Sequence, residues 1–270
     1  MNFETLSVTA ADGVATVELN RPDKANAMNA PMWQEIRRAF EWVDATPAVR
    51  VAILRGRGKA FCSGIDLAML AGLQQQLVDA CEGRRREQLH QVILDLQDTL
   101  TSIERCRKPV LAAIHGACVG GAIDLVNCCD MRYASTDAWF AVREIDMGMV
   151  ADVGTLQRLP KLVPAGIARE LAYTGRNCDA AEAHAIGLVE RVYATPEALH
   201  SGVAALAAQI AGKSPLAIRG IKRTLLHARD HSVAEGLEHV ASWNASMLLS
   251  SDLNEAIAAF MQKRPAKFAD

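Results

Sequence analysis

Three acidic residues follow a glycine-rich turn in the middle of this 270-residue sequence. Asp124 comes just after the paired glycines Gly120 and Gly121, and Glu144 and Asp152 follow in the next stretch. All three lie in a largely apolar segment, where a charge is costly unless it has a task. Carboxyl groups in such surroundings often donate and accept protons in catalysis. The pattern therefore favours a site that moves protons.

Each acid also has a purely structural interpretation, which the residues alone leave open. Asp124 could be a buried ion-pair partner, for example of an arginine. Glu144 could be a charge at the end of a strand that pairs with the adjacent Arg143. Asp152 could cap the N-terminus of a helix that begins just after it.

Two glycine junctions could supply backbone donors beside these acids. One is the segment Phe61 to Leu67, and the other is the pair Gly120 and Gly121 before the helix of Asp124. Each follows an apolar strand pattern and opens a helix. A glycine at such a junction can present a backbone N–H group with no side chain in the way. Together they predict an oxyanion hole, a pair of donors for a developing negative charge.

Other kinds of site find no support in the residues. His227 and His231 have helical spacing, but no third metal ligand falls beside them in a recognisable pattern. The sequence contains no P-loop, dinucleotide fingerprint or nucleophile elbow. We therefore expect no metal and no separate cofactor. With a net charge near −2 and no long apolar run, we also expect no nucleic acid and no membrane as a partner.

The cysteines bear on the cellular compartment. There are seven of them, with no CxxC pair, which indicates reduced thiols rather than a disulfide framework. The first residues resemble no signal peptide. We therefore expect a cytoplasmic protein.

The order of strand and helix patterns predicts an α/β fold. Alternation fades after residue 195, and from Pro196 onward every pattern is helical. We therefore expect an α/β core over residues 1–195 and a helical region over residues 196–270. The expected strands are 6–10, 14–19, 51–54, 110–114 and 188–193, and the expected helices of the core are 31–43, 88–105, 166–174 and 180–186.

Two strings of residues carry a resemblance to a known family. GKAFCSGIDL (58–67) and KPVLAAIHGACVGGAIDLVNCCDMRYAS (108–135) resemble the crotonase, or enoyl-CoA hydratase/isomerase, superfamily, and the likeness runs along nearly the whole chain. It implies a spiral of ββα units with a helical trimerisation region, assembled as a homotrimer or as a hexamer of two trimers. It also implies an acyl-CoA thioester substrate, whose carbonyl oxygen would lie between the N–H groups of Ile65 and Gly121.

The acids indicate which reaction the resemblance implies. Typical hydratases of the family carry glutamate where this chain has Asp124. ADVGTLQRLPK (151–161), together with Asp124, Glu144 and Asp152, resembles the Δ3,5-Δ2,4-dienoyl-CoA isomerases. These convert 3,5-dienoyl-CoA to 2,4-dienoyl-CoA in the β-oxidation of unsaturated fatty acids. The resemblance implies that Glu144 and Asp152 exchange protons at C2 and C6, in an order that the sequence leaves open, while Asp124 supports them.

Further residues are implied in binding the acyl-CoA, and two alternative functions stay open. The alternatives are an enoyl-CoA hydratase or another enoyl-CoA isomerase of the same fold, and a crotonase-like RNA-binding protein. The net negative charge and the complete set of acids argue against the second. Phe260 and Lys263 of the last helix would close over the nucleotide, often from a neighbouring subunit. The implied contacts with the acyl-CoA are Lys24, Ala25, Ala27, Ser63, Gly64, Ile65, Asp66, Leu67, Gly121, Phe260 and Lys263.

Overall fold

A mixed sheet forms the centre of the protein. The computed structural model describes residues 2–270, apart from the side chains of residues 73–76. The strand order is β1–β2–β3–β4–β6–β9, with β1 and β2 antiparallel and every later neighbour parallel. The expected α/β fold is confirmed. The strands are β1 (Leu6–Ala11), β2 (Val14–Leu19), β3 (Val51–Gly56), β4 (Val110–Ile114), β6 (Met131–Ser135) and β9 (Arg191–Tyr193).

Helices cover both faces of this sheet, because its central strands are apolar on both sides. Along β3, Val51 and Ile53 contribute to one buried cluster, while Ala52 and Leu54 contribute to the other. Alternation of this kind is expected of a strand buried on both faces. The helix α8 (Pro196–Ala211) packs on the first cluster. On the second cluster lie α1 (Ala30–Ala45) and α4 (Gly121–Asn127), and α3 (Glu82–Arg105) packs against α1.

A second, three-stranded sheet brings the two glycine junctions together. It consists of β5 (Ala117–Val119), β7 (Trp139–Ala141) and β8 (Cys178–Asp179). Cys62 extends its edge, since its N–H donates to Ala117 O at 3.0 Å and its carbonyl accepts from Val119 N at 3.1 Å. The segment after β3 is therefore paired with the segment after β4. Strands of two or three residues have too little pattern to be predicted from sequence.

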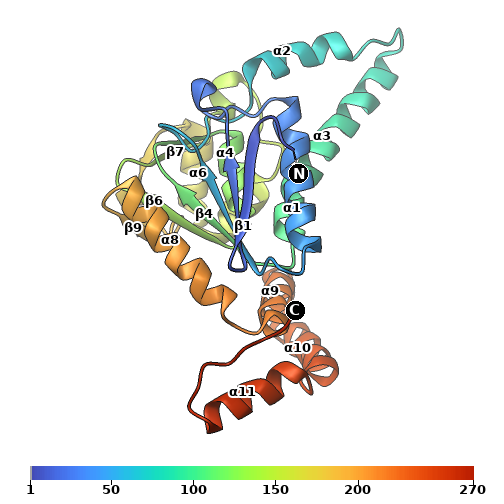
Figure 1. Ribbon diagram of the computed structural model, residues 1–270. Coiled ribbons are helices and arrows are strands. Elements are labelled where there is room, and N and C mark those ends of the chain that lie inside the picture. The colour runs from blue at the N-terminus through green and yellow to red at the C-terminus, as the bar shows by residue number, and fades with distance from the viewer. Residues whose placement is uncertain (1) are drawn as a thin grey trace.

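The last three helices extend away from the sheet. They are α9 (Pro215–Asp230), α10 (Val233–Met247) and α11 (Ser251–Met261), at the bottom of Figure 1. The predicted helical region 196–270 also contains α8, which packs on the sheet, so the division at residue 195 stays a prediction. The remaining elements are η1 (Pro22–Lys24), α2 (Leu67–Gln76), η2 (Glu144–Met147), α5 (Thr155–Arg158), η3 (Leu159–Lys161), α6 (Ala165–Thr174) and α7 (Ala180–Ala185). None of the helices within residues 2–270 is both long and apolar enough to cross a bilayer.

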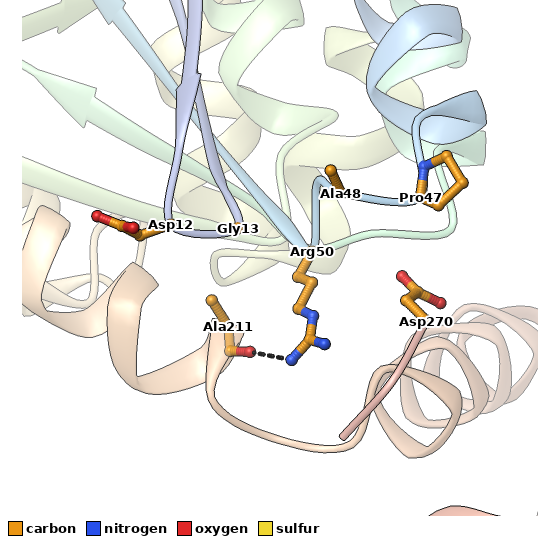
Figure 2. A pocket seen from close by; sticks show the side chains of 7 residues that line it. All are labelled: Asp12, Gly13, Pro47, Ala48, Arg50, Ala211 and Asp270. Carbon is orange, nitrogen blue, oxygen red and sulfur yellow. Dashed lines mark hydrogen bonds between the residues drawn. The ribbon is translucent and has the colours of Figure 1, made fainter. Parts of the chain in front are cut away.

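The C-terminal tail returns to the base of the sheet and lines a cavity of about 410 Å3 there (Figure 2). Arg50, which precedes β3, crosses this region. Its guanidinium donates to Ala211 O, at the end of α8, at 3.0 Å and to Phe268 O, in the tail, at 2.5 Å. In the tail, Asp270 pairs with Arg219 of α9 at 2.6 Å. One arginine thus joins the sheet, α8 and the tail.

Candidate active site

The backbone N–H groups of Ile65 and Gly121 lie close to one another. Ile65 N is 3.7 Å from the point that a Cβ on Gly121 would occupy. Gly64 allows this approach, since it has a φ of +91° and a Cβ there would come within 2.7 Å of Val119 O. Only glycine fits such a backbone without strain. The glycines of the two junctions therefore let the two loops meet.

Both N–H groups are free to bind a ligand. Met28 pairs with the residues on either side of Ile65: Met28 N donates to Gly64 O at 2.8 Å, and Met28 O accepts from Asp66 N at 3.0 Å. Gly121 is the first residue of α4, where an N–H group has no partner within the helix. Among the described residues, neither Ile65 N nor Gly121 N donates to another protein group. Two converging free donors can stabilise an oxyanion.

Asp124 is wholly buried in α4, the helix that begins at Gly121. Its Oδ1 accepts a hydrogen bond from Thr155 N at the start of α5, and in the described part of the chain its Oδ2 has no partner. Burial raises the pKa of Asp124 to about 6, against the lowering effect of the Thr155 hydrogen bond. The negative charge of Asp152 adds to the rise. Among the described residues, Asp124 forms no direct ion pair with an arginine, so the structural role suggested by the sequence is not observed.

Glu144 lies over the glycine that precedes the second donor. Its Oε1 is 3.3 Å from the position of a Cβ on Gly120, whose φ of +55° also requires glycine. Burial, and then the charge of Asp124, raises the pKa of Glu144 to about 7. The neighbouring Arg143 pairs with Asp146 at 2.8 Å instead of Glu144. Glu144 is therefore not a neutralised strand-end charge.

Asp152 is the most accessible of the three acids. It lies in the loop before α5, and the residue is exposed. Partial desolvation still raises the pKa of its carboxyl, and its charge raises the pKa of both Asp124 and Glu144. The cap of α5 is Gly154, with no side-chain cap bond, so Asp152 does not serve as the helix cap.

The arrangement suits proton transfer beside a polarised carbonyl. Burial raises the pKa of all three carboxyl groups, and the negative charges of Asp124 and Asp152 raise that of Glu144 further. Such groups cannot all be ionised easily, so one neutral acid and one charged base can coexist near neutral pH. Glu144, with a pKa of about 7, is divided between the two forms there. Among the described residues, Glu144 Oε2 is buried and has no hydrogen-bond partner. Such carboxylate oxygens are uncommon in structures unless they serve a function.

The N-terminal segment implied in coenzyme A binding lies against the first glycine junction. Ser63 N donates to Ala25 O at 3.0 Å. The carboxylate of Asp66 accepts from the Arg21 guanidinium and from Ala68 N, both at 3.0 Å, which holds the pKa of Asp66 below its usual range. The predicted site residues that the fold gathers here are Lys24, Ala25, Ala27, Ser63, Gly64, Ile65, Asp66, Leu67 and Gly121.

Two predicted residues lie elsewhere. Phe260 is in the last turn of α11, with 82 % of its surface exposed, and Lys263 follows this helix. In Figure 1, α11 is at the bottom of the view, whereas α2, which begins at Leu67 beside the first junction, is at the top. A single chain therefore does not bring Phe260 and Lys263 to its own site.

Sequence reasoning missed the residues that hold the site in place. The wholly buried Asn26 donates through its amide to Ala60 O at 2.9 Å and to Phe61 O at 3.1 Å. Asparagine tolerates the left-handed backbone that Asn26 adopts, with a φ of +56°. Thr155, which holds Asp124, and Gln97, which donates to Asp152 O at 2.6 Å, were missed as well. An asparagine in a Pro-containing loop was a usable signal for the first, but the other two contacts are long-range.

Within the described ranges, no cluster of three or more histidine, cysteine, aspartate or glutamate side chains is arranged to hold a metal ion.

The chain is similar to known proteins over nearly its whole length. The family model for enoyl-CoA hydratase/isomerase matches residues 9–270. The chain is 48% identical to the peroxisomal Δ(3,5)-Δ(2,4)-dienoyl-CoA isomerase of Arabidopsis thaliana, with 93% of this chain and 91% of that protein covered. It is 44% identical to the mitochondrial enzyme of the same name from Mus musculus, with 98% and 82% covered. Its fold matches the crystal structure of an enoyl-CoA hydratase from Bacillus anthracis with a TM-score of 0.89 and 30% identity, covering 98% and 99%.

The expected cytoplasmic location is wrong. The relatives named above are peroxisomal in Arabidopsis thaliana and mitochondrial in Mus musculus. The expectation rested on reduced thiols, which indicate that a protein is not in an oxidising compartment such as the ER lumen. They do not distinguish the cytosol from the interior of another organelle.

Proposed function

The chain belongs to the enoyl-CoA hydratase/isomerase family, and from this and its three carboxyl groups we infer that it isomerises 3,5-dienoyl-CoA to 2,4-dienoyl-CoA. The observation that carries the inference is that Asp124, Glu144 and Asp152 all have raised pKa values and that Glu144 lies beside two free N–H groups. Relatives named as this isomerase are 44% and 48% identical to the chain, against 30% for the hydratase structure. The isomerase is therefore favoured over the hydratase and RNA-binding alternatives, as part of unsaturated fatty acid oxidation.

The reaction begins at C2 of the substrate. C2 lies between the thioester carbonyl and the C3=C4 bond, so its proton is the most acidic. Its removal spreads negative charge from the thioester oxygen along the chain to C6. We assign Ile65 N–H and Gly121 N–H to that oxygen. One good donor of this kind stabilises the transition state by about 3–4 kcal/mol.

Glu144 is our candidate for the base at C2. Its carboxylate lies over Gly120, next to the N–H group of Gly121 that would hold the thioester oxygen. C2 is bonded to the thioester carbon, so a base beside the oxyanion donors is near C2. A pKa of about 7 lets Glu144 accept the proton at neutral pH.

Asp152 is then the acid that protonates C6. It lies on a different loop from Glu144, and partial desolvation raises the pKa of its carboxyl above the ordinary value. Since C2 and C6 are several ångströms apart, two separate carboxyl groups suit the reaction better than one. We assign Asp124, buried and held by Thr155, to orienting and tuning the other two acids.

Coenzyme A binding would be completed by a second copy of the chain. Phe260 and Lys263 are distant from the site of their own chain, and α9–α11 carry many exposed apolar side chains, an unusual surface for a monomer. We propose that these helices assemble a homotrimer, or a hexamer of two trimers, in which the α11 region closes over a neighbour's nucleotide. Among the exposed side chains are Ile221, Leu225, Leu237, Leu249, Ile257, Phe260 and Met261.

The test follows absorbance in the ultraviolet. The 2,4-dienoyl thioester is conjugated with its carbonyl and absorbs at longer wavelength than the 3,5-dienoyl substrate. We expect purified protein to produce this absorbance rapidly from 3,5-dienoyl-CoA, and Asp152→Asn to lower turnover by about 100-fold or more. Hydration of a 2-enoyl-CoA without formation of the 2,4-diene would contradict the proposed function.

A further inference from the structure

One face of α3 runs beside the loop that carries Asp152. Gln97, Thr101 and Glu104 lie on that face, since residues four and seven apart on a helix share one side. Gln97 Nε2 donates to Asp152 O at 2.6 Å. Farther along α3, Thr101 Oγ1 and Glu104 Oε2 accept from Arg158 Nη2 at 3.3 Å and 3.1 Å. The helix α3 therefore contacts the segment 152–158 at both ends of that segment, at Asp152 and at Arg158.

The second contact is largely buried. The side chains of Glu104 and Arg158 are each 14 % exposed, and Arg229 of α9 also donates to Glu104. Arg158 packs beneath the loop at Gly154, where an added Cβ would collide with its guanidinium at 2.1 Å. An ion pair of this kind fixes the end of the segment at α5.

The first contact is the one nearest the reacting group. Asp152 is exposed, and the loop before it belongs to no regular element. Throughout the described residues, Gln97 is the only side chain that hydrogen-bonds to the backbone of Asp152. A carboxyl group on such a loop needs an anchor if it is to meet one particular carbon of the substrate.

We propose that Gln97 is a positioning residue that holds Asp152 in place for proton transfer at the far end of the diene, an inference that rests on the function proposed above. Gln97 contacts the backbone of Asp152, so it acts on the position of the carboxyl group without touching the substrate. Reacting groups tolerate little misplacement, and a shift of about 1 Å can lower a rate about 100-fold. The long helix α3 supplies the fixed reference that the loop lacks.

The experiment replaces Gln97 with a side chain of similar length that has no donor. Gln97→Met keeps the apolar stem and loses the amide, and Gln91→Met, at an exposed position of the same helix, is the matched control. For Gln97→Met we expect kcat for 3,5-dienoyl-CoA to fall about tenfold with KM unchanged. The control should retain the wild-type kcat. Thermal unfolding of both variants shows whether the fold persists, and Gln97→Ala is the second variant if Gln97→Met is unstable.

Two further measurements separate positioning from a general structural role. If Asp152 moves toward solvent, its pKa falls toward the ordinary value, so the limb of the pH–rate profile that belongs to Asp152 moves to lower pH. In an Asp152→Asn background, Gln97→Met should have no additional effect on the residual turnover. Both results support the proposal.

Three results would overturn it. These are an unchanged kcat in both Gln97 variants, an unmoved pH–rate profile, or the same tenfold loss in the Asp152→Asn background. Each would leave the proposed isomerase function intact, since the wild-type enzyme would still be active. A wild-type protein without isomerase activity would overturn both proposals at once.

Discussion

Replacing Glu144 with glutamine should abolish most activity and at the same time stabilise the protein at alkaline pH. The pKa of Glu144 is raised from 4.5 to about 7, chiefly by burial, so ionisation of this side chain is costly in the folded state. The stability that the protonated carboxyl contributes is fully present below pH 4.5 and is lost as the pH rises through 7. The glutamine amide of the variant would stay neutral throughout this range.

The size of the effect follows from the pKa. A rise from 4.5 to about 7 corresponds to about 3 kcal/mol of unfolding free energy, as an upper value. Glu144 is only partly buried, so the effect should be smaller than this upper value. We expect the unfolding free energy of Glu144→Gln, relative to that of the wild type, to rise by about 1–3 kcal/mol between pH 5 and pH 8. The same substitution removes the proposed base at C2, which should lower kcat about 100-fold to 10,000-fold.

Urea denaturation at several pH values measures the first effect, and the dienoyl-CoA assay measures the second. Asp146→Asn is the matched control, because Asp146 lies in the same short helix but is exposed and paired with Arg143. It should change the unfolding free energy by less than about 0.5 kcal/mol at either pH. If the difference between Glu144→Gln and the wild type were the same at pH 5 and pH 8, the burial argument for Glu144 would be refuted.

Two other substitutions test the backbone and the nucleotide contact. Gly120→Ala should lower the unfolding free energy by about 1–3 kcal/mol in urea denaturation and should reduce kcat. The reason is that Gly120 has a φ of +55° and that an added Cβ would press on Glu144. The control Gly72→Ala, in open space on α2, should change neither quantity. Lys263→Ala should raise KM for the CoA thioester in steady-state assays with little change in kcat. The control Lys267→Ala should leave KM and kcat unchanged. If both variants raised KM equally, a specific role for Lys263 would be contradicted.

Much of the fold could be predicted from local pattern. The apolar run Val110–Ile114 predicted β4, and the helical periodicity after residue 30 predicted α1, each within a few residues. The expected strands 6–10 and 14–19 correspond to β1 and β2, which pair across the turn at Asp12 and Gly13. These elements are specified by neighbouring residues, so a single sequence is enough to find them.

The second sheet and the anchors of the acids could not be predicted in this way. Strands β5, β7 and β8 have two or three residues each, too few to show alternation. The bonds from Thr155 to Asp124 and from Gln97 to Asp152 join residues far apart in the sequence. No periodicity reports such pairs, because they arise only when the chain is folded.

The three acids were found because charge is conspicuous in an apolar segment, yet their chemistry needed the structure. The residues alone allowed Asp152 to be a helix cap, and the observed cap is Gly154. They allowed Glu144 to pair with Arg143, which pairs with Asp146 instead. Which interpretation holds depends on where the oppositely charged groups lie, and that is set by tertiary packing.

The hydrogen bonds of Arg50 at the base of the sheet tie the C-terminal tail to the start of β3 and to the end of α8. Its guanidinium holds the last carbonyl of α8 and the carbonyl of Phe268, and its own backbone leads directly into β3, the strand before the oxyanion loop. The tail is therefore not a loose appendage that can fray while the sheet stays intact. Detachment of the tail would free α11 and uncover the end of α8 at the same time. The amides of the tail, of α11 and of the end of α8 should therefore exchange with solvent as one cooperative unit.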